Sequence, residues 1–211
     1  MSSDQRLSPR FNIPLVLLIV CLTISAYAGT KSAVDTAKNN RAEYEASLRE
    51  LRKSAEAGDA SAQNALGLLY YEGKGVSQHY GQAKEWFEKA AKQGHAGAQV
   101  NLGTLYFLGN GAPQSDQMAL VWFQRAAAQR DALAFAKLGR MYERGQGVSQ
   151  DLIQAHMWYN LSAAHGEKRA AEIRDALANQ MTSGQIVEAQ RLAVEWKSKD
   201  RPGVFPTTAG R

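Results

Sequence analysis

The stretch Leu66–Ser77, LGLLYYEGKGVS, decides the fold because it recurs at a fixed spacing of 36 residues. The corresponding segments are LGTLYFLGNGAP at 102–113 and LGRMYERGQGVS at 138–149. The EGKG portion alone could indicate a phosphate-binding loop. However, Lys74 is replaced by Asn110 and Gln146 in the other copies, and no Ser or Thr follows the lysine as a P-loop requires. The repeated feature is therefore a backbone turn.

Three repeat units, 58–93, 94–129 and 130–165, align without a gap. In each unit the first half has apolar residues at helical spacing and ends at paired glycines, which adopt the positive φ common after a helix. The second half, with Ala and Trp at helical spacing, predicts a second helix. A single hairpin cannot bury both faces, so stability is expected from stacked neighbours. Positions shared by all copies include Leu66/Leu102/Leu138, Gly67/Gly103/Gly139, Tyr70/Tyr106/Tyr142 and Trp86/Trp122/Trp158.

The flanks of the array predict caps. Residues 29–57 contain an N-terminal capping helix, and residues 166–198 contain two further capping helices after the register has decayed. The tail 199–211 has two prolines and no periodicity, which predicts disorder. The expected fold is an all-α, right-handed solenoid of stacked helical hairpins.

The segment 1–28 has the composition of an export signal. Arg6 and Arg10 precede an uncharged apolar run that ends in Ala26-Tyr27-Ala28, a small-x-small site for cleavage after Ala28. An uncleaved membrane anchor is a second interpretation, because the run is nearly long enough to span a bilayer. Lipid attachment at Cys21 is a third, although Val20 is bulky for that chemistry. All three place the body outside the cytoplasm.

The chain has 211 residues and a formal net charge of +5, but its charges alternate in sign along the sequence. Nucleic-acid binding is therefore not expected, since phosphate neutralisation needs a clustered patch. Cys21 is the only cysteine, so cleavage would leave a mature chain without disulfides, thiol catalysis or thiolate metal sites. The membrane is expected to be contacted only through the N-terminal segment, if that segment is retained.

The pattern A-x-x-x-LG-x-L/M-Y-x-x-G-x-G-V/A, followed by A-x-x-W-F/Y-x-x-A/S-A, resembles the Sel-one-like repeat family, a relative of the tetratricopeptide repeats. The resemblance is strong over residues 58–165. It implies a scaffold that binds other proteins along a curved surface; many bacterial relatives are exported. Some exported relatives carry a disulfide in each repeat, and the present sequence departs from that subset.

No constellation of catalytic or ligating residues is evident, and we expect no catalytic, cofactor-binding or metal site. Gly-x-Ser-x-Gly and His-Glu-x-x-His are both absent. His79, His95, His156 and His165 have no carboxylate or second histidine at the spacing of a helical metal site, and are expected to be surface or packing residues.

A variable stripe on the first helix of each unit is the candidate partner-binding surface. These positions follow one helical face and differ between copies, whereas the neighbouring positions hardly vary. In a hairpin solenoid the first helices line the concave side. The alternative is that Leu68, Tyr71 and Phe107 pack between hairpins. The stripe residues are Ser61, Asn64, Leu68 and Tyr71; Gly97, Val100, Thr104 and Phe107; and Leu133, Ala136, Arg140 and Glu143.

The sequence thus favours a non-enzymatic scaffold, exported to the bacterial periplasm or envelope, that holds a protein or peptide partner in its concave groove. The alternatives are an envelope hydrolase, which would need a catalytic site assembled from distant loops, and a membrane-tethered spacer if residues 1–28 are retained.

Overall fold

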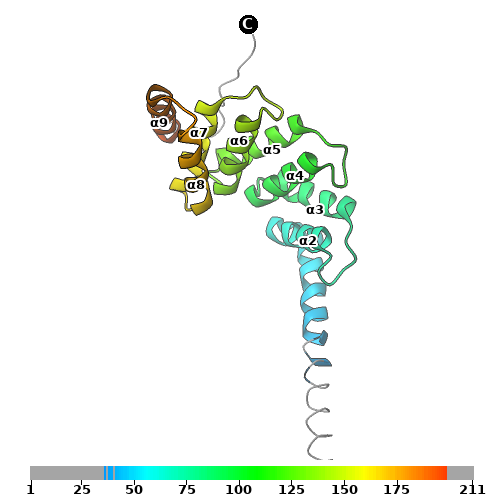
Figure 1. The fold of residues 1–211 in the computed structure, drawn as a ribbon. Coiled ribbons are helices and arrows are strands. Elements are labelled where there is room, and N and C mark those ends of the chain that lie inside the picture. Colours follow the sequence, from blue (N-terminus) through cyan, green and yellow to red (C-terminus); the bar gives the residue numbers. More distant parts are fainter. Residues whose placement is uncertain (1–35, 37, 40, 199–211) are drawn as a thin grey trace, which may run out of the picture. The chain divides into compact units, whose positions relative to one another are not determined.

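The computed structural model describes residues 36, 38, 39 and 41–198. Backbone contacts divide the chain into two units, residues 1–50 and residues 51–211, and residues 41–50 of the first unit are helical. In the second unit, residues 51–56 are helical and eight labelled helices follow (Figure 1). These are α2 (Ala60–Glu72), α3 (Tyr80–Lys92), α4 (Ala96–Leu108), α5 (Asp116–Ala128), α6 (Ala132–Arg144), α7 (Leu152–Ala164), α8 (Lys168–Ala178) and α9 (Ser183–Ser198).

Each repeat unit forms one antiparallel helical hairpin, and successive hairpins stack. The hairpins are α2 with α3, α4 with α5, and α6 with α7, while α3 packs on α4 and α5 packs on α6 (Figure 1). Both α8 and α9 pack on α7 at the C-terminal end of the array. The described residues contain helices and no strand, so the prediction of an all-α solenoid of hairpins is confirmed.

The helix starts repeat with the sequence period. Asp59, His95 and Asp131 cap α2, α4 and α6, and each side chain accepts a hydrogen bond from a backbone N–H of the first turn. Such a bond satisfies a donor that has no partner inside the helix. Glu167 caps α8 at the same spacing, so the period continues one helix beyond the third unit.

The turn glycine after the first helix has the predicted conformation. Gly73 has φ of 71°, and its N–H donates to the carbonyl oxygen of Leu69. The junctions between units also need positive φ, and Gly58, Gly94 and Gly166 supply it at three of them. The fourth junction has Arg130 with φ of 64°, the one described non-glycine residue in this region. Arg130 therefore carries local backbone strain that glycine avoids at the other junctions.

A second glycine, inside each first helix, allows the two helices of a hairpin to approach closely. A Cβ added to Gly67 would lie 2.6 Å from the ring of Phe87, and one added to Gly103 would lie 2.7 Å from the ring of Phe123. In the third hairpin, a Cβ on Gly139 would lie 2.8 Å from the ring of Tyr159. The invariant Leu-Gly pair thus reflects an aromatic ring seated against the helix backbone.

Buried glutamines join the first two hairpins to their neighbours. Gln93 donates from Nε2 to Oε1 of Gln63, whose own Nε2 donates to the carbonyl oxygen of Ala55. One unit later, Gln129 donates to Gln99 at the same 2.8 Å distance. Because buried amides are costly without partners, each glutamine pair fixes the two helices of its own hairpin. The bonds from Gln63 to Ala55 and from Gln99 Nε2 to the carbonyl oxygen of Ala91 tie each hairpin to the helix before it.

An aromatic cluster replaces the glutamine pair at the C-terminal end. Phe135 occupies the position of the buried glutamines, with its ring centroid 5.8 Å from Trp158 and 4.9 Å from Trp196 of α9. His165 packs edge-on against Phe135 at 5.2 Å. The sequence change from glutamine to aromatic residues therefore marks where stacking of repeats gives way to a cap.

The expectations for residues 1–28 and for the tail 199–211 concern chain outside the described residues. Among residues 36, 38, 39 and 41–198, no helix combines the length and apolar character needed to cross a bilayer.

Candidate functional site

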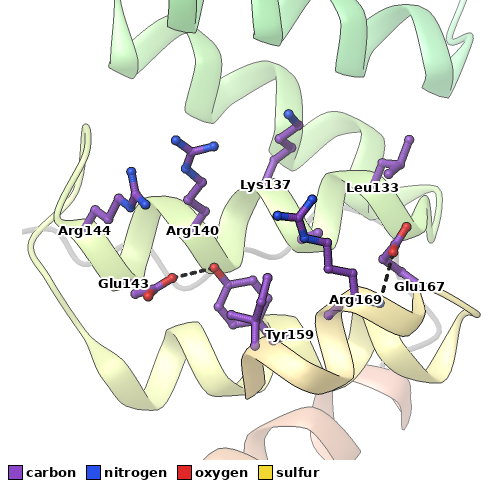
Figure 2. Close-up of a pocket in the computed structure, with 11 residues that line it drawn as sticks. Leu133, Lys137, Arg140, Glu143, Arg144, Tyr159, Glu167 and Arg169 are labelled. Carbon is purple, nitrogen blue, oxygen red and sulfur yellow. Dashed lines mark hydrogen bonds between the residues drawn. The ribbon is translucent and has the colours of Figure 1, made fainter. Parts of the chain in front are cut away.

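An open pocket of about 560 Å³ lies between α6, α7 and α8 (Figure 2). The four stripe residues of the third unit, Leu133, Ala136, Arg140 and Glu143, all line it. They share one face of α6 because they are spaced by three or four residues. The sequence-based stripe and the pocket therefore coincide in this unit.

Four cationic side chains line the pocket: Lys137, Arg140 and Arg144 from α6, and Arg169 from α8. In Figure 2 the three α6 side chains extend from the same side of the helix and Arg169 approaches from α8. None of the four forms a salt bridge with any described residue. Burial lowers the pKa of the Lys137 amine, and the neighbouring Arg140 lowers it further. Lys137 is therefore the partly desolvated cation of the pocket, whereas Arg140, Arg144 and Arg169 are exposed.

The two carboxylates of the pocket have other hydrogen-bond partners. Tyr159 donates from its hydroxyl to Oε2 of Glu143 at 2.6 Å. Glu167 accepts from the backbone N–H of Arg169 at 3.3 Å as the cap of α8. Burial and the hydrogen bond to Glu143 raise the pKa of Tyr159, so its hydroxyl stays protonated as the donor. With four cations and two carboxylates, the pocket has excess positive charge.

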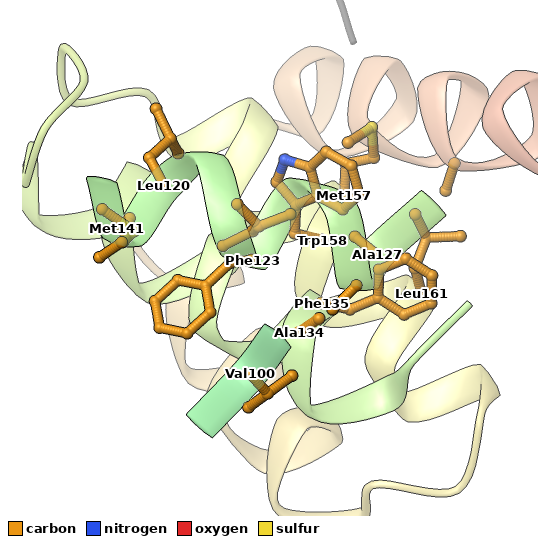
Figure 3. Packing of buried hydrophobic residues seen from close by; sticks show 14 of the residues in the cluster. Val100, Leu120, Phe123, Ala127, Ala134, Phe135, Met141, Met157, Trp158 and Leu161 are labelled. Atoms are coloured by element: carbon orange, nitrogen blue, oxygen red, sulfur yellow. The ribbon is translucent and has the colours of Figure 1, made fainter. Parts of the chain in front are cut away.

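A smaller hollow of about 100 Å³ adjoins the pocket and shares Lys137 and Arg140 with it. Its remaining lining comes from Thr104, Phe107, Leu108, Phe123 and Met141. Phe123 and Met141 belong to the buried cluster drawn in Figure 3, so the hollow opens onto the core of the second and third hairpins. The Arg140 guanidinium lies 5.7 Å from the ring centroid of Phe107. We call the pocket and the hollow together the cationic groove.

The groove also has exposed apolar surface. Leu133 is 53% exposed and Leu108 is 50% exposed. Ala170 and Ile173 of α8 add apolar atoms to the wall of the pocket. Cations beside apolar surface suit a ligand that carries both an anionic and an apolar group.

The other predicted stripe residues lie elsewhere. Val100 is 5% exposed and belongs to the buried cluster, so it is a core residue (Figure 3). Leu68 and Tyr71 are half-buried and pack against the cluster of the first two hairpins. Tyr71 packs against Tyr80 with 5.5 Å between ring centroids and an angle of 57° between the ring planes. Asn64 accepts a hydrogen bond from Asn101 Nδ2 at 2.9 Å.

The structure thus gathers six of the stripe residues at the groove and leaves the first unit out of it. Thr104 and Phe107 line the hollow, while the four residues of the third unit line the pocket. Thr104 also donates from Oγ1 to the carbonyl oxygen of Val100 at 2.9 Å.

Three of the four cations in the groove are not predicted by the stripe. Lys137, Arg144 and Arg169 were not among the stripe residues, although the sequence has a signal for them. Lys137, Arg140 and Arg144 share one face of α6, whereas the first unit has Ala65, Leu68 and Glu72 there and the second has Asn101, Thr104 and Leu108. Continuing the 36-residue period beyond the third unit also places Arg169 at the first position of the stripe.

The described residues contain no group of three or more His, Cys, Asp or Glu side chains arranged to hold a metal ion. Two histidines instead cap helices: Nδ1 of His79 accepts from the N–H of Gln82, and Nδ1 of His95 accepts from that of Ala98. His156 is buried at 3% exposure. Each of these imidazoles has a structural position rather than a place in the groove.

Comparison with known proteins identifies the repeats. The family model described as Sel1 repeat matches residues 60–95, 96–131 and 132–167. Among solved structures, a protective antigen of uropathogenic Escherichia coli with an SLR fold is similar at 30% identity and a TM-score of 0.69, over 79% of this chain and 38% of that chain. A Sel1 repeat protein from Oxalobacter formigenes is 35% identical with a TM-score of 0.56, over 62% of this chain and 98% of that chain. A search of curated proteins gives no significant match.

The chain therefore spans well under half the length of the E. coli antigen. The matched repeats begin two residues later than the units drawn from the sequence, at the first residue of each first helix.

Proposed function

The chain belongs to the Sel1 repeat family, and on that premise we propose that it is a non-enzymatic scaffold that binds a protein partner in the cationic groove. Proteins built from these repeats generally mediate protein–protein interaction. The single observation that supports this location is the coincidence of the variable stripe with the groove in the third unit. Positions that differ between otherwise matching repeats, and that line an open pocket, are free from the packing constraints of the core.

The groove has features of a binding surface and lacks those of a catalytic one. The groove is open and is lined by the exposed side chains of Leu133 and Leu108. Its two carboxylates, Glu143 and Glu167, are 24 positions apart in sequence, and each accepts a hydrogen bond from a donor of its own. Among its lining residues, the hydroxyl beside a carboxylate is that of Tyr159, which is 2% exposed and has a raised pKa, so it is not activated as a nucleophile. These features favour recognition over the envelope hydrolase considered as an alternative.

We propose that the scaffold acts in the periplasm or at the envelope. This part of the proposal rests on the sequence of residues 1–28, with its basic start, apolar run and Ala26-Tyr27-Ala28 ending. Intact mass of the exported protein tests it, with Gly29 as the expected new N-terminus. Retention of the segment would instead favour an anchored body or a membrane-tethered spacer.

Photo-crosslinking in the producing cell tests partner binding directly. A photoreactive amino acid is placed at Leu133, which is exposed in the groove, and in a matched strain at Val194, which is 67% exposed on α9 outside the groove. We expect a discrete crosslinked protein from position 133 that is absent from position 194. Equal adducts from both positions, or none from position 133, would contradict binding in the groove.

A further inference from the structure

We infer that the cationic groove recognises an acidic peptide segment of the partner, with a carboxylate side chain in the pocket and a neighbouring apolar side chain in the hollow. This inference rests on the proposed function and specifies the chemistry of the ligand. It follows from the arrangement of charge and apolar surface around Lys137 and Arg140, the two residues that the pocket and the hollow share.

The pocket is lined by four cationic side chains. Lys137, Arg140, Arg144 and Arg169 have no salt-bridge partner among the described residues, whereas Lys84 in α3 pairs with Glu88 at 2.8 Å. Like charges gathered on one surface repel one another, and an incoming anion relieves that repulsion. Guanidinium groups also bind a carboxylate with two parallel hydrogen bonds, which gives the site orientation as well as charge complementarity.

The groove's own acids do not neutralise these cations. The Glu143 carboxylate is held by the Tyr159 hydroxyl, and the Glu167 carboxylate caps α8. The four cations of the lining therefore outnumber its two carboxylates, which leaves a formal excess of positive charge. An acidic ligand is therefore favoured over a basic one by the sum of the lining charges.

The hollow favours a peptide ligand over a small anion. The hollow beside Arg140 is bounded by Phe107 and by the buried Met141, and it offers apolar contact that inorganic phosphate could not use. A peptide presents an acidic and an apolar side chain within a few residues of each other, at the scale of two adjoining cavities. Charge gives orientation and the apolar side chain gives burial.

Fluorescence anisotropy with the full chain tests the inference. The probe is a short fluorescein-labelled peptide of glutamate and alanine with a central leucine, and the matched control peptide has glutamine in place of every glutamate. We expect the acidic peptide to bind and the glutamine peptide to bind about tenfold or more weakly, because charge-assisted hydrogen bonds are each stronger than neutral ones. Equal affinity for both peptides would overturn the inference.

Variants locate the site. The double variant Lys137→Gln/Arg140→Gln removes two charges from the groove, and Lys89→Gln/Lys92→Gln removes two exposed charges from α3. We expect about a tenfold or larger loss of acidic-peptide affinity only in the first, with Arg169→Gln as a milder exposed substitution should the double variant melt early. Equal losses in both double variants would show non-specific attraction and contradict the assignment.

Competitors identify the ligand class. Inorganic phosphate at matched ionic strength, or a single-stranded oligothymidine, should displace the acidic peptide poorly; equal competition by either would overturn the peptide assignment in favour of a small anion or a nucleic acid. The outcome is separable from the proposed function. If a partner crosslinks at position 133 but the protein does not bind the acidic peptide, the scaffold proposal stands and the acidic-peptide inference is wrong. If no partner crosslinks at position 133, the proposed function is wrong.

Discussion

Tyr159 connects the core of the third hairpin to its variable surface: its hydroxyl donates to Glu143 Oε2 at 2.6 Å, while its ring lies against Gly139. The equivalent rings in the other hairpins are Phe87 and Phe123, which have no hydroxyl. The third unit thus pairs a polar ring with a polar stripe residue. The Tyr159 hydroxyl, rather than a cation, thus holds the Glu143 carboxylate at the edge of the groove.

Replacement of Tyr159 by phenylalanine should destabilise the fold by about 1–2 kcal/mol, since a hydrogen bond to a charged acceptor is lost while the ring is kept. Urea denaturation measures the change. In a Glu143→Gln background the same replacement should have a smaller effect, because the acceptor no longer carries charge. An identical loss in both backgrounds would contradict the proposed energetic link between the two residues.

Gly103→Ala should destabilise the protein by about 1–3 kcal/mol, because the new methyl group would lie 2.7 Å from the Phe123 ring. Gly184→Ala is the matched control, since Gly184 lies in helix α9 with open space around its Cβ position. That substitution should stabilise by up to about 1 kcal/mol through helix propensity. Thermal melts compare the two, and a neutral Gly103→Ala would refute close ring packing.

Arg130→Gly should stabilise the protein by about 1 kcal/mol, because Arg130 has the positive φ that its equivalents meet with glycine. The reciprocal variant Gly94→Ala should lower stability, since Gly94 has φ of 90°. Chemical denaturation distinguishes the opposite signs. Destabilisation by Arg130→Gly would mean that the arginine side chain contributes more than the backbone strain costs.

Acidification should destabilise the fold through His156. Burial lowers the pKa of His156 below its ordinary 6.5, with Arg174 lowering it further and Asp175 opposing. The folded state therefore binds fewer protons than the unfolded state between the two pKa values. The contribution of neutral His156 to stability is full above pH 6.5 and is lost as the pH falls toward the lowered pKa.

Melting temperatures at pH 7 and pH 5 check this effect. The drop on acidification should be smaller in His156→Gln than in the wild type. His79→Asn, which removes an exposed imidazole while keeping a side-chain oxygen as the cap of α3, should retain the drop. An unchanged drop in His156→Gln would assign the pH dependence to other groups.

The fold was largely predictable from the sequence because the same helical hairpin is encoded by three repeat units. Comparing copies separated positions that the backbone requires, such as Gly73 and Gly67, from positions free to vary. The period also extends further than expected, since α8 begins 36 residues after α6. The register is lost afterwards, where α9 begins closer to α8 than α7 does to α6.

Helical spacing in the sequence predicted only some of the groove residues. Helical spacing identifies a shared face, but it does not tell how deeply neighbouring hairpins cover each position. Val100 and Arg140 lie on the same stripe, yet Val100 is buried between hairpins and Arg140 is exposed. The contribution of Arg169 depends on the packing of α8 on α7, a tertiary contact that brings Arg169 to the pocket lined by α6. Such contacts follow from packing rather than from the pattern of one helix.

The most direct test of the account is tandem mass spectrometry of the partner peptide crosslinked at Leu133. We expect one segment with aspartate or glutamate within a few residues of a large apolar side chain, and loss of that adduct in Lys137→Gln/Arg140→Gln. A crosslinked segment that is basic or uncharged, or an adduct unaffected by removal of the two cations, would contradict it.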